Sequence, residues 1–275
     1  MSSRNRRRIG ITAFEGGVLR RREDCLAEEA PLEIHIAGVP PLVTMRTPGQ
    51  DAELVAGLMF TEGVVRDASE IVSLQPGAGP HGRIVRLMLR APARLRLPLA
   101  ERSGLASSAC GVCGKPSFST AVLDRQPVPR GEARIGTHVL DRLPERLRAA
   151  QGLFERTGGL HAAGLFSAAG ELLAAREDVG RHNALDKLVG WGLRRGNLPW
   201  DDRIVLLSGR ASYELLHKCV MAGAPVVCAI SAPSTLAVEV ARRFDVTLAG
   251  FLRDGRVNLY SAPWRVSGAA AERRG

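Results

Sequence analysis

The residues best suited to chemistry are Cys110 and Cys113, which lie in a segment of sequence SSACGVCGK. A cysteine acts as a nucleophile through its thiolate, and a free thiol is only slightly ionised at pH 7. Lys115 follows Cys113 by two residues, and an ammonium group at 4 Å would stabilise the thiolate by about 4 kcal/mol at an effective dielectric of about 20. Gly111 and Gly114 allow backbone conformations with positive φ. The segment therefore favours a loop that presents a reactive sulfur.

Three other interpretations compete with a nucleophilic thiol. A structural zinc site needs two more ligands, and without a second C-x-x-C these would have to come from His161 or a second subunit. A thioredoxin-like redox pair should directly follow a strand, yet Pro98 to Ala109 shows no clear strand pattern. The pair could also be inert. A zinc nucleobase deaminase is rejected on chemistry, because Ala163 stands where H-x-E requires the glutamate and the C-x-x-C precedes His161.

The remaining cysteines, Cys25, Cys219 and Cys228, give no sign of a disulfide framework. Their total with the C-x-x-C pair is odd, the chain is long, and no export signal is apparent. Cys219 and Cys228 lie in apolar stretches, which predicts inert core positions.

Two polar motifs stand before predicted elements. Thr157-Gly158-Gly159-Leu160-His161 precedes a strand, and its histidine could be either functional or a hydrogen-bonded core residue. Glu177 to Asn183 precedes a helix, where Arg181 could bind a phosphate and His182 could transfer a proton. The simpler alternative is a solvated helix start that Asp178 or Asn183 caps.

Two further motifs follow predicted strands and suit an anion. Ser208-Gly209-Arg210 combines small residues, free backbone N–H groups and one arginine, although it is not a Walker motif. Arg253-Asp254-Gly255-Arg256 places two arginines beside an Asp-Gly pair, which could equally be a simple hairpin turn.

The composition favours a folded, basic protein with an aliphatic core. The chain has 275 residues, 45% of them apolar and only 4% aromatic, with a net charge of +10. That charge suggests an anionic partner, or it reflects an arginine-rich composition alone. No apolar run is long enough for a membrane helix, and the polar start argues against a secretory signal, so we expect a cytoplasmic protein without a membrane partner.

The hydrophobic pattern predicts a basic, disordered tail over residues 1–12 and a small α+β domain over 13–105. Strand patterns cover Leu32–Ile36, Leu42–Met45, Ile71–Leu74 and Ile84–Leu89. Between the second and third of these, a helical stripe follows Asp51 as a predicted N-cap.

The remainder, residues 106–265, predicts an α/β domain with the C-x-x-C loop at its start. Strand and helix patterns alternate from Ala162 to Tyr260, which is typical of a mostly parallel sheet with helices on its faces. Ligands of such sheets bind beyond the carboxyl ends of the strands. We therefore expect the loops at Ser208–Arg210, Ser231–Pro233 and Arg253–Arg256 to line a site.

Taken together in this order, the motifs resemble the FdhD (NarQ) family of formate dehydrogenase accessory proteins. The resemblance rests on SSACGVCGK, the Thr157–His161 motif, the run from Glu177 to Lys187, Ser208-Gly209-Arg210 and Ser231-Ala232-Pro233-Ser234. The match extends from about Glu33 to Tyr260, and the motifs are specific in combination rather than singly.

The resemblance implies a sulfurtransferase. Such proteins take persulfide sulfur from a cysteine desulfurase and pass it to the bis-molybdopterin guanine dinucleotide form of the molybdenum cofactor, before this enters formate dehydrogenase. The persulfide position falls on Cys110, and Cys113 assists. The family's cofactor-binding loop falls on Phe251, Leu252, Arg253, Asp254, Gly255 and Arg256, with weaker candidates at Arg181, His182, Ser208, Gly209 and Arg210. The resemblance also implies a cytidine-deaminase-like, three-layer larger domain and a homodimer, and a guanine nucleotide could mimic the cofactor.

Two functions from other classes compete with sulfur transfer. The chain could be a non-catalytic chaperone that binds and delivers the molybdenum cofactor. It could also be a zinc-stabilised nucleic-acid binder, but aromatic stacking platforms for bases are scarce, so we expect no nucleic-acid partner and no metal site.

Overall fold

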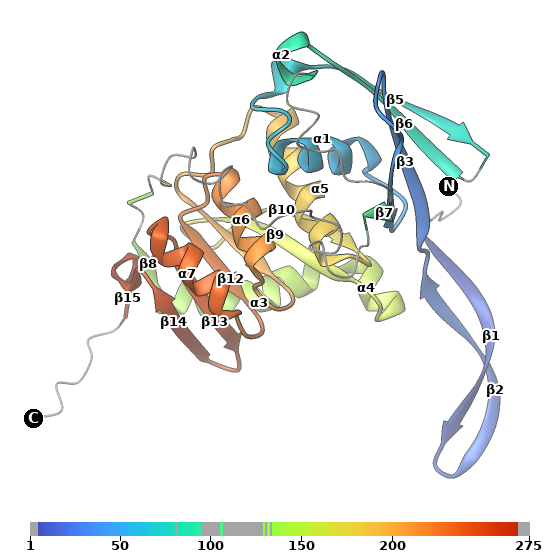
Figure 1. Cartoon of the computed structure of the whole chain (residues 1–275). Coiled ribbons are helices and arrows are strands. Elements are labelled where there is room, and N and C mark those ends of the chain that lie inside the picture. Colours follow the sequence, from blue (N-terminus) through green and yellow to red (C-terminus); the bar gives the residue numbers. More distant parts are fainter. Residues whose placement is uncertain are drawn as a thin grey trace, which may run out of the picture.

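The computed structural model describes residues 5–80, 82–94, 105–106, 129, 131–132 and 134–268. Among them, two large β-sheets lie on either side of a layer of helices, and a long β-hairpin projects from the body (Figure 1). None of the described helices combines the length and the apolar character that crossing a membrane requires.

The projecting hairpin, which we call the arm, consists of β1 (Arg6–Glu15) and β2 (Val18–Ala27). Gly16 and Gly17 form its turn with φ values of 58° and 84°, a left-handed conformation that glycine adopts without a steric cost. The predicted disordered tail over residues 1–12 is therefore wrong from Arg6 onward. The arginine-rich start contains alternating Ile9, Ile11 and Ala13, a strand pattern that its charge concealed.

The smaller sheet has five strands in the order β5-β6-β3-β4-β7. Its strands and short helices have these bounds: β3 (Ala30–Ile36), β4 (Leu42–Arg46), η1 (Ala68–Glu70), β5 (Ile71–Gly79), β6 (Gly82–Leu89), α2 (Ala91–Arg94) and β7 (Leu105–Ala106). Helix α1 (Asp51–Thr61) covers the face of this sheet that carries Leu32, Ile34 and Ile36. The residue at the N-cap of α1 is Gln50 rather than the predicted Asp51.

The larger sheet has six strands in the order β10-β9-β11-β12-β13-β14. They are β9 (His161–Ser167), β10 (Leu172–Asp178), β11 (Arg203–Leu207), β12 (Val226–Ala229), β13 (Thr247–Arg253) and β14 (Arg256–Ser261). Only the β11–β12 and β12–β13 pairings are parallel, so the prediction of a mostly parallel sheet is wrong. Two hairpins, β9–β10 and β13–β14, and the antiparallel pairing of β9 with β11 supply the remaining contacts between strands.

Helices cover both faces of the larger sheet. They are α3 (Thr137–Ala150), α4 (Gly152–Thr157), α5 (Arg181–Arg194), α6 (Tyr213–Met221) and α7 (Thr235–Arg243). Successive side chains of β11 point to opposite faces of the sheet. Ile204 and Leu206 pack with α3 on one face, whereas Val205 and Leu207 join the core beneath α5, α6 and α7 on the other. A turn, η4 (Pro263–Arg265), and a two-stranded pair of β8 (Ile135–Gly136) with β15 (Val266–Ser267) complete the fold.

Candidate functional site

The four polar motifs meet at one edge of the larger sheet. Strands β11 and β12 are parallel, so their carboxyl ends at Leu207 and Ala229 lie at the same edge. Strand β9 is antiparallel to β11 and begins there with His161, which pairs with Asp178 at the end of β10. This is the carboxyl edge at which α/β proteins bind ligands, as the sequence predicts.

Backbone hydrogen bonds join the predicted loops at this edge. The Ser231 N–H donates to the Gly209 carbonyl at 3.3 Å, and the Ala211 N–H donates to Ala232 at 3.2 Å. The Phe251 N–H donates to the Ser231 carbonyl at 3.2 Å, which brings the start of the Phe251–Arg256 segment to the same place. The side chain of Ser208 accepts from the Ala162 N–H at 2.8 Å. These bonds bring Gly209, Ser231 and Phe251 together, while a shared binding role of the loops stays a prediction.

A cavity of about 420 Å³ opens beside His161. Its floor is apolar, and its rim includes Gly158, Gly159, His161 and Ser208 from the predicted motifs. The guanidinium of Arg148 lies 4.0 Å from the centre of the Phe154 ring at the same rim, a cation–π contact. The cavity thus combines apolar walls with a few polar groups, which is typical of a small-molecule site.

His161 is held neutral at this edge. Burial lowers its pKa, and the positive charges of Arg181 and His182 lower it further. A methyl group added at Gly209 would lie 3.4 Å from the Nδ1 atom of His161, so the glycine leaves the ring room. A neutral imidazole can both donate and accept a hydrogen bond towards a ligand.

Two helices begin at this edge, and several buried polar atoms around their first turns have no hydrogen-bond partner among the described residues. Neither the α5 N-cap, Gly180, nor the α6 N-cap, Ser212, makes a side-chain capping bond. The Nε atom of Arg181, the Oγ atom of Ser212 and one carboxylate oxygen of Glu214 are buried and unpartnered. Buried polar atoms normally find partners, so the Arg181 and Ser212 donors suit a bound anion, whereas the Glu214 oxygen suits a hydrogen-bond donor or an ordered water.

Sequence reasoning did not identify Ser212 or Glu214. Glu214 and His182 are 5% and 6% exposed, and their Oε2 and Nε2 atoms lie 3.1 Å apart. An acidic residue in the first turn of a helix ordinarily suggests a solvated position. Only the contact with His182, from a distant segment, gives Glu214 its place in the site.

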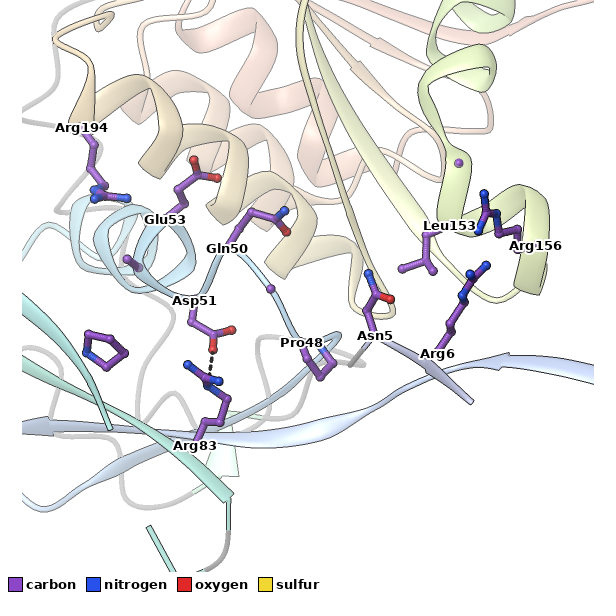
Figure 2. A pocket seen from close by; sticks show the side chains of 14 residues that line it. Asn5, Arg6, Pro48, Gln50, Asp51, Glu53, Arg83, Leu153, Arg156 and Arg194 are labelled. Atoms are coloured by element: carbon purple, nitrogen blue, oxygen red, sulfur yellow. Dashed lines mark ion pairs between the residues drawn. The ribbon is translucent and has the colours of Figure 1, made fainter. Parts of the chain in front are cut away.

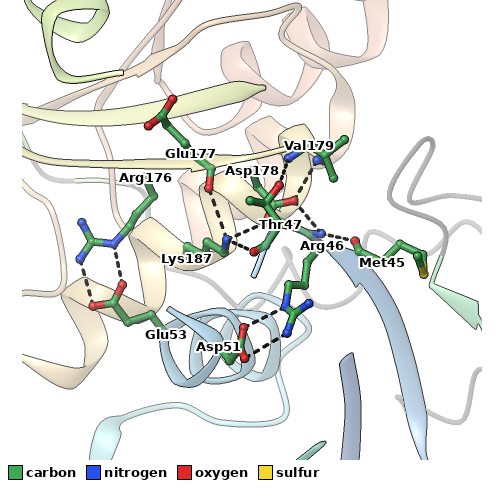
Figure 3. Close-up of polar contacts among 12 residues, drawn as sticks. Met45, Arg46, Thr47, Asp51, Glu53, Arg176, Glu177, Asp178, Val179 and Lys187 are labelled. Carbon is green, nitrogen blue, oxygen red and sulfur yellow. Dashed lines mark hydrogen bonds and ion pairs between the residues drawn. The ribbon is translucent and has the colours of Figure 1, made fainter. Parts of the chain in front are cut away.

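The motif around Asp178 is a buried anchor and not a solvated helix start (Figure 3). Lys187 Nζ lies 2.6 Å from Asp178 Oδ2 and donates to the Thr47 carbonyl at 2.9 Å. Asp178 also accepts from the backbone N–H groups of Thr47 and Gly180, at 3.1 and 2.9 Å. Asn183 donates to the Met45 carbonyl at 2.7 Å. These contacts fix the end of β4 against the start of α5, and so hold the site's frame.

The Phe251–Arg256 segment is mostly strand and turn. Asp254 and Gly255 have φ values of 54° and 69° between the paired residues Arg253 and Arg256, so the simple hairpin turn is confirmed. Leu252 is 1% exposed and packs in the core beside α3, which leaves its side chain unable to contact a ligand. Arg253 and Arg256 are exposed, as is Arg210 in the neighbouring loop. Whether this segment binds the cofactor stays a prediction.

Cys110 and Cys113 lie outside the described residues. The chain enters that segment from β7, where Ala106 pairs with Thr44 in parallel. Strand β4 continues from Thr44 to Met45, which contacts Asn183 at the site. Cys219 and Cys228 are fully buried, and burial raises the pKa of Cys228 to about 12 and that of Cys219 even further, as expected for inert core thiols.

The fold and this edge define an α/β protein with a polar site beyond the carboxyl ends of β11 and β12. The sequence model of the FdhD/NarQ family matches residues 27–267, so the chain belongs to the FdhD/NarQ family. It is 45% identical over 257 residues to a sulfur carrier protein FdhD of Nocardia farcinica, covering 92% of each chain. It is 44% identical to a protein of the same name in Streptomyces avermitilis, covering 96% of this chain and 97% of the relative.

A solved structure shares the fold. It is a protein from Desulfotalea psychrophila described as a formate dehydrogenase accessory protein, with a TM-score of 0.72 and 22% sequence identity. The similarity covers 95% of this chain and 99% of that one.

Proposed function

We propose that this chain is a cytoplasmic sulfurtransferase in which Cys110 carries a persulfide. It receives sulfur from a cysteine desulfurase and transfers it to the bis-molybdopterin guanine dinucleotide cofactor, which is its substrate, before insertion into formate dehydrogenase. The names of the relatives, sulfur carrier protein FdhD, support sulfur transfer. The observation that carries the proposal is the meeting of residues from three of the motifs, His161, Val179 and Ser208, at one cavity of mostly apolar lining at the carboxyl edge.

Loading of sulfur onto Cys110 is an exchange between thiols. The Cys110 thiolate attacks the outer sulfur of the desulfurase persulfide, a new S–S bond forms, and the old S–S bond breaks. The desulfurase cysteine leaves as a thiolate, so no external oxidant or reductant is needed. Cys113 follows Cys110 by three residues and assists.

Chain connectivity supports delivery to the described edge. Four residues separate Ala106 from Cys110, a length that spans at most about 14 Å when fully extended. Ala106 pairs with Thr44 of β4, whose following residues Met45 and Thr47 contact Asn183 and Asp178 at the site. The described end of this connection therefore lies close to the edge where the motifs meet.

The described residues at this edge fit a phosphate-bearing substrate. Arg181 and Ser212 offer buried, unpartnered polar atoms at two helix N-termini, and Arg210, Arg253 and Arg256 are exposed around them. Neutral His161 can accept or donate a hydrogen bond in the cavity. These groups would bind and orient the substrate, with Phe251–Arg256 as the nucleotide-binding segment. A cytidine-deaminase-like architecture and a homodimer are parts of the same proposal.

The proposal is tested by loading the purified full-length protein with a cysteine desulfurase and cysteine, and measuring intact mass. We expect the parent protein to gain the mass of one sulfur atom, removable with a thiol reductant, and Cys110→Ala to gain none. Cys219→Ala is the matched control, because that thiol is buried and should leave loading unchanged. Full loading of Cys110→Ala would remove Cys110 from the role.

A second candidate is a chaperone that binds the cofactor without carrying sulfur. The unpartnered polar atoms near Arg181 and Ser212 favour it, because they support ligand binding independently of any cysteine. This candidate predicts that the double variant Cys110→Ala, Cys113→Ala fully supports formate dehydrogenase activity in a strain lacking the parent protein. Sulfur transfer predicts an inactive dehydrogenase that still contains molybdenum.

A further inference from the structure

The arm is an unpartnered ribbon that lies almost entirely outside the part of the chain matched by the family, residues 27–267. Among the described strands, β1 and β2 pair only with each other, so both outer edges keep unpaired backbone groups. A two-stranded ribbon is marginally stable alone. The base of the arm packs beside α4, where Ala27 lies next to Gly159.

The arm carries a surplus of positive charge. It has six arginines and three acidic residues between Arg6 and Ala27. Two of these acidic residues form ion pairs within the arm, Glu15 with Arg22 at 2.6 Å and Glu23 with Arg8 at 3.3 Å. The third, Asp24, accepts a hydrogen bond from the Cys25 N–H at 2.8 Å. Arg6, Arg20 and Arg21 have no carboxylate partner among the described residues.

A basic groove begins where the arm joins the body (Figure 2). It consists of two hollows, of about 790 and 530 Å³, that share Arg6 and Arg156. In Figure 2 these two side chains extend towards each other from β1 and α4, and Arg194 stands at the other end of the larger hollow. We call these two hollows the arm groove.

The acidic residues of the arm groove do not neutralise it. Asp51 is held by Arg46 through two hydrogen bonds of 2.9 and 3.1 Å, and Glu53 by Arg176 at 2.5 and 2.9 Å. Asp51 also pairs with Arg83, an arginine that lines the groove, at 3.4 Å. Neither Arg46 nor Arg176 lines the groove. Arg6, Arg156 and Arg194 therefore face it without a carboxylate partner in the described part of the chain, and their field favours an acidic ligand.

The tip of the arm is apolar. Phe14 and Leu19 are paired across the two strands, on the same face, and are 71% and 70% exposed. Val18 beside them is 51% exposed. Exposed aromatic and aliphatic side chains combined with arginines are typical of the centre of a protein interface. A small anion would gain no hydrogen bond or ion pair from the apolar side chains.

We infer that the arm and the arm groove form a docking surface for an extended, acidic segment of a protein partner. The arginines attract its carboxylates, the apolar tip packs against its hydrophobic residues, and the free strand edges can accept its backbone. A second copy of this chain fits poorly, because its net charge of +10 would bring two basic surfaces together. The inference does not depend on sulfur transfer.

The test measures binding of a fluorescein-labelled peptide of about twelve alternating glutamate and leucine residues to the full-length protein by fluorescence anisotropy. We expect saturable binding that weakens when sodium chloride is raised from about 50 to about 300 mM. The double variant Arg6→Glu, Arg156→Glu should lose about tenfold or more in affinity. The variant Phe14→Ser, Leu19→Ser should also bind less tightly, although it changes no charge.

The control is Arg142→Glu, an exposed position on α3, a helix that does not line the arm groove. It removes the same kind of charge and should retain the parent affinity. Circular dichroism melting checks that all variants fold.

Three outcomes would overturn the inference. Equal loss of binding in Arg142→Glu would show a general charge effect. Full displacement of the peptide by millimolar pyrophosphate, with no effect of the tip variant, would indicate a small-anion site. A concentration-dependent dimer that dissociates in Phe14→Ser, Leu19→Ser would assign the arm to a second copy.

Discussion

Lys187 and Asp178 are fully buried, and each depends on the other. An ion in the protein interior is tolerated only when a counter-charge and hydrogen-bond donors or acceptors replace water. Here Lys187 has Asp178, the Thr47 carbonyl and the Glu177 carbonyl, the last at 3.3 Å. The motif's charges thus hold two distant segments together rather than facing a ligand.

Lys187→Met should lower the free energy of unfolding by about 3 kcal/mol, because it leaves the Asp178 carboxylate buried without its cation. Urea unfolding followed by circular dichroism measures the loss. The double variant Asp178→Asn, Lys187→Met removes both charges and should lose less than the sum of the two single variants. Simple additivity of the two losses would contradict the proposed coupling.

His161 should make stability depend on pH in the acidic range. Burial and neighbouring positive charges lower its pKa in the folded state, whereas in the unfolded chain it takes up a proton near pH 6.5. Below that pH the unfolded state binds more protons, so the free energy of unfolding falls as the pH drops. His161→Gln should lack this contribution to the pH dependence. The free energy of unfolding of both proteins is measured by urea unfolding from pH 7.5 to about 5.5, and a difference between them that stays constant over this range would contradict the prediction.

At the residue scale, sequence reasoning predicted the site from motifs that carry their own chemistry. It placed Ser208 at the carboxyl edge, and the structure brings His161, Arg181 and His182 beside it. Their role in binding stays a prediction. Glu214 could not be predicted, because its role comes from a contact with His182 across two helices. The same limitation explains Leu252, whose place in the core depends on which face of β13 meets α3.

Helices α1 and α5 cross at a point where only glycine fits. A Cβ atom at Gly190 would lie 1.8 Å from the Glu53 carbonyl oxygen, and one at Gly57 equally close to the Asp186 carbonyl. The backbones are therefore in direct contact, which joins helix α1 of the smaller sheet to helix α5 of the larger one.

Gly190→Ala should destabilise the protein by about 3 kcal/mol, since the added methyl group forces the two helices apart. Gly152→Ala is the control, because a Cβ atom there meets nothing within 4 Å. It should change the free energy of unfolding by no more than about 0.5 kcal/mol. Thermal melting of the two variants compares them, and equal melting temperatures would argue against the tight crossing.

Most elements could be predicted from periodicity, since apolar alternation and helical stripes survive in any tertiary setting. The strand β10 was not predicted, because its run Leu172–Asp178 is half-exposed at the sheet edge and ends in charged residues. The arm was missed for a similar reason. Strand direction depends on pairing partners far along the chain, which local patterns do not encode.

The two large sheets share one hydrophobic core. Its members include Leu32 and Val85 of the smaller sheet and Val205 and Val227 of the larger one. Because one apolar cluster includes residues of both sheets, we expect both sheets to unfold in one cooperative transition. Scanning calorimetry should give equal calorimetric and van't Hoff enthalpies, and two resolved peaks would refute the single core.

At the scale of the molecule, sequence reasoning predicted two α/β regions with a site at a strand edge. It could not predict how the regions pack, because the contact between Gly57 and Gly190 joins positions that look like ordinary helix interiors. Whether a domain boundary falls between residues 105 and 106 stays a prediction.

Helix α4 lines both the cavity beside His161 and the arm groove. Phe154 lines the cavity beside His161, whereas Leu153 and Arg156 line the arm groove. The Glu177 carboxylate accepts hydrogen bonds from the backbone N–H groups of Leu153 and Phe154 at 3.1 and 2.7 Å. These bonds connect the start of α4 to the end of β10. A ligand in the cavity that shifts α4 would therefore change the shape of the arm groove, and a ligand in the arm groove would change the shape of the cavity. By linkage, each ligand would change the affinity for the other ligand by the same factor.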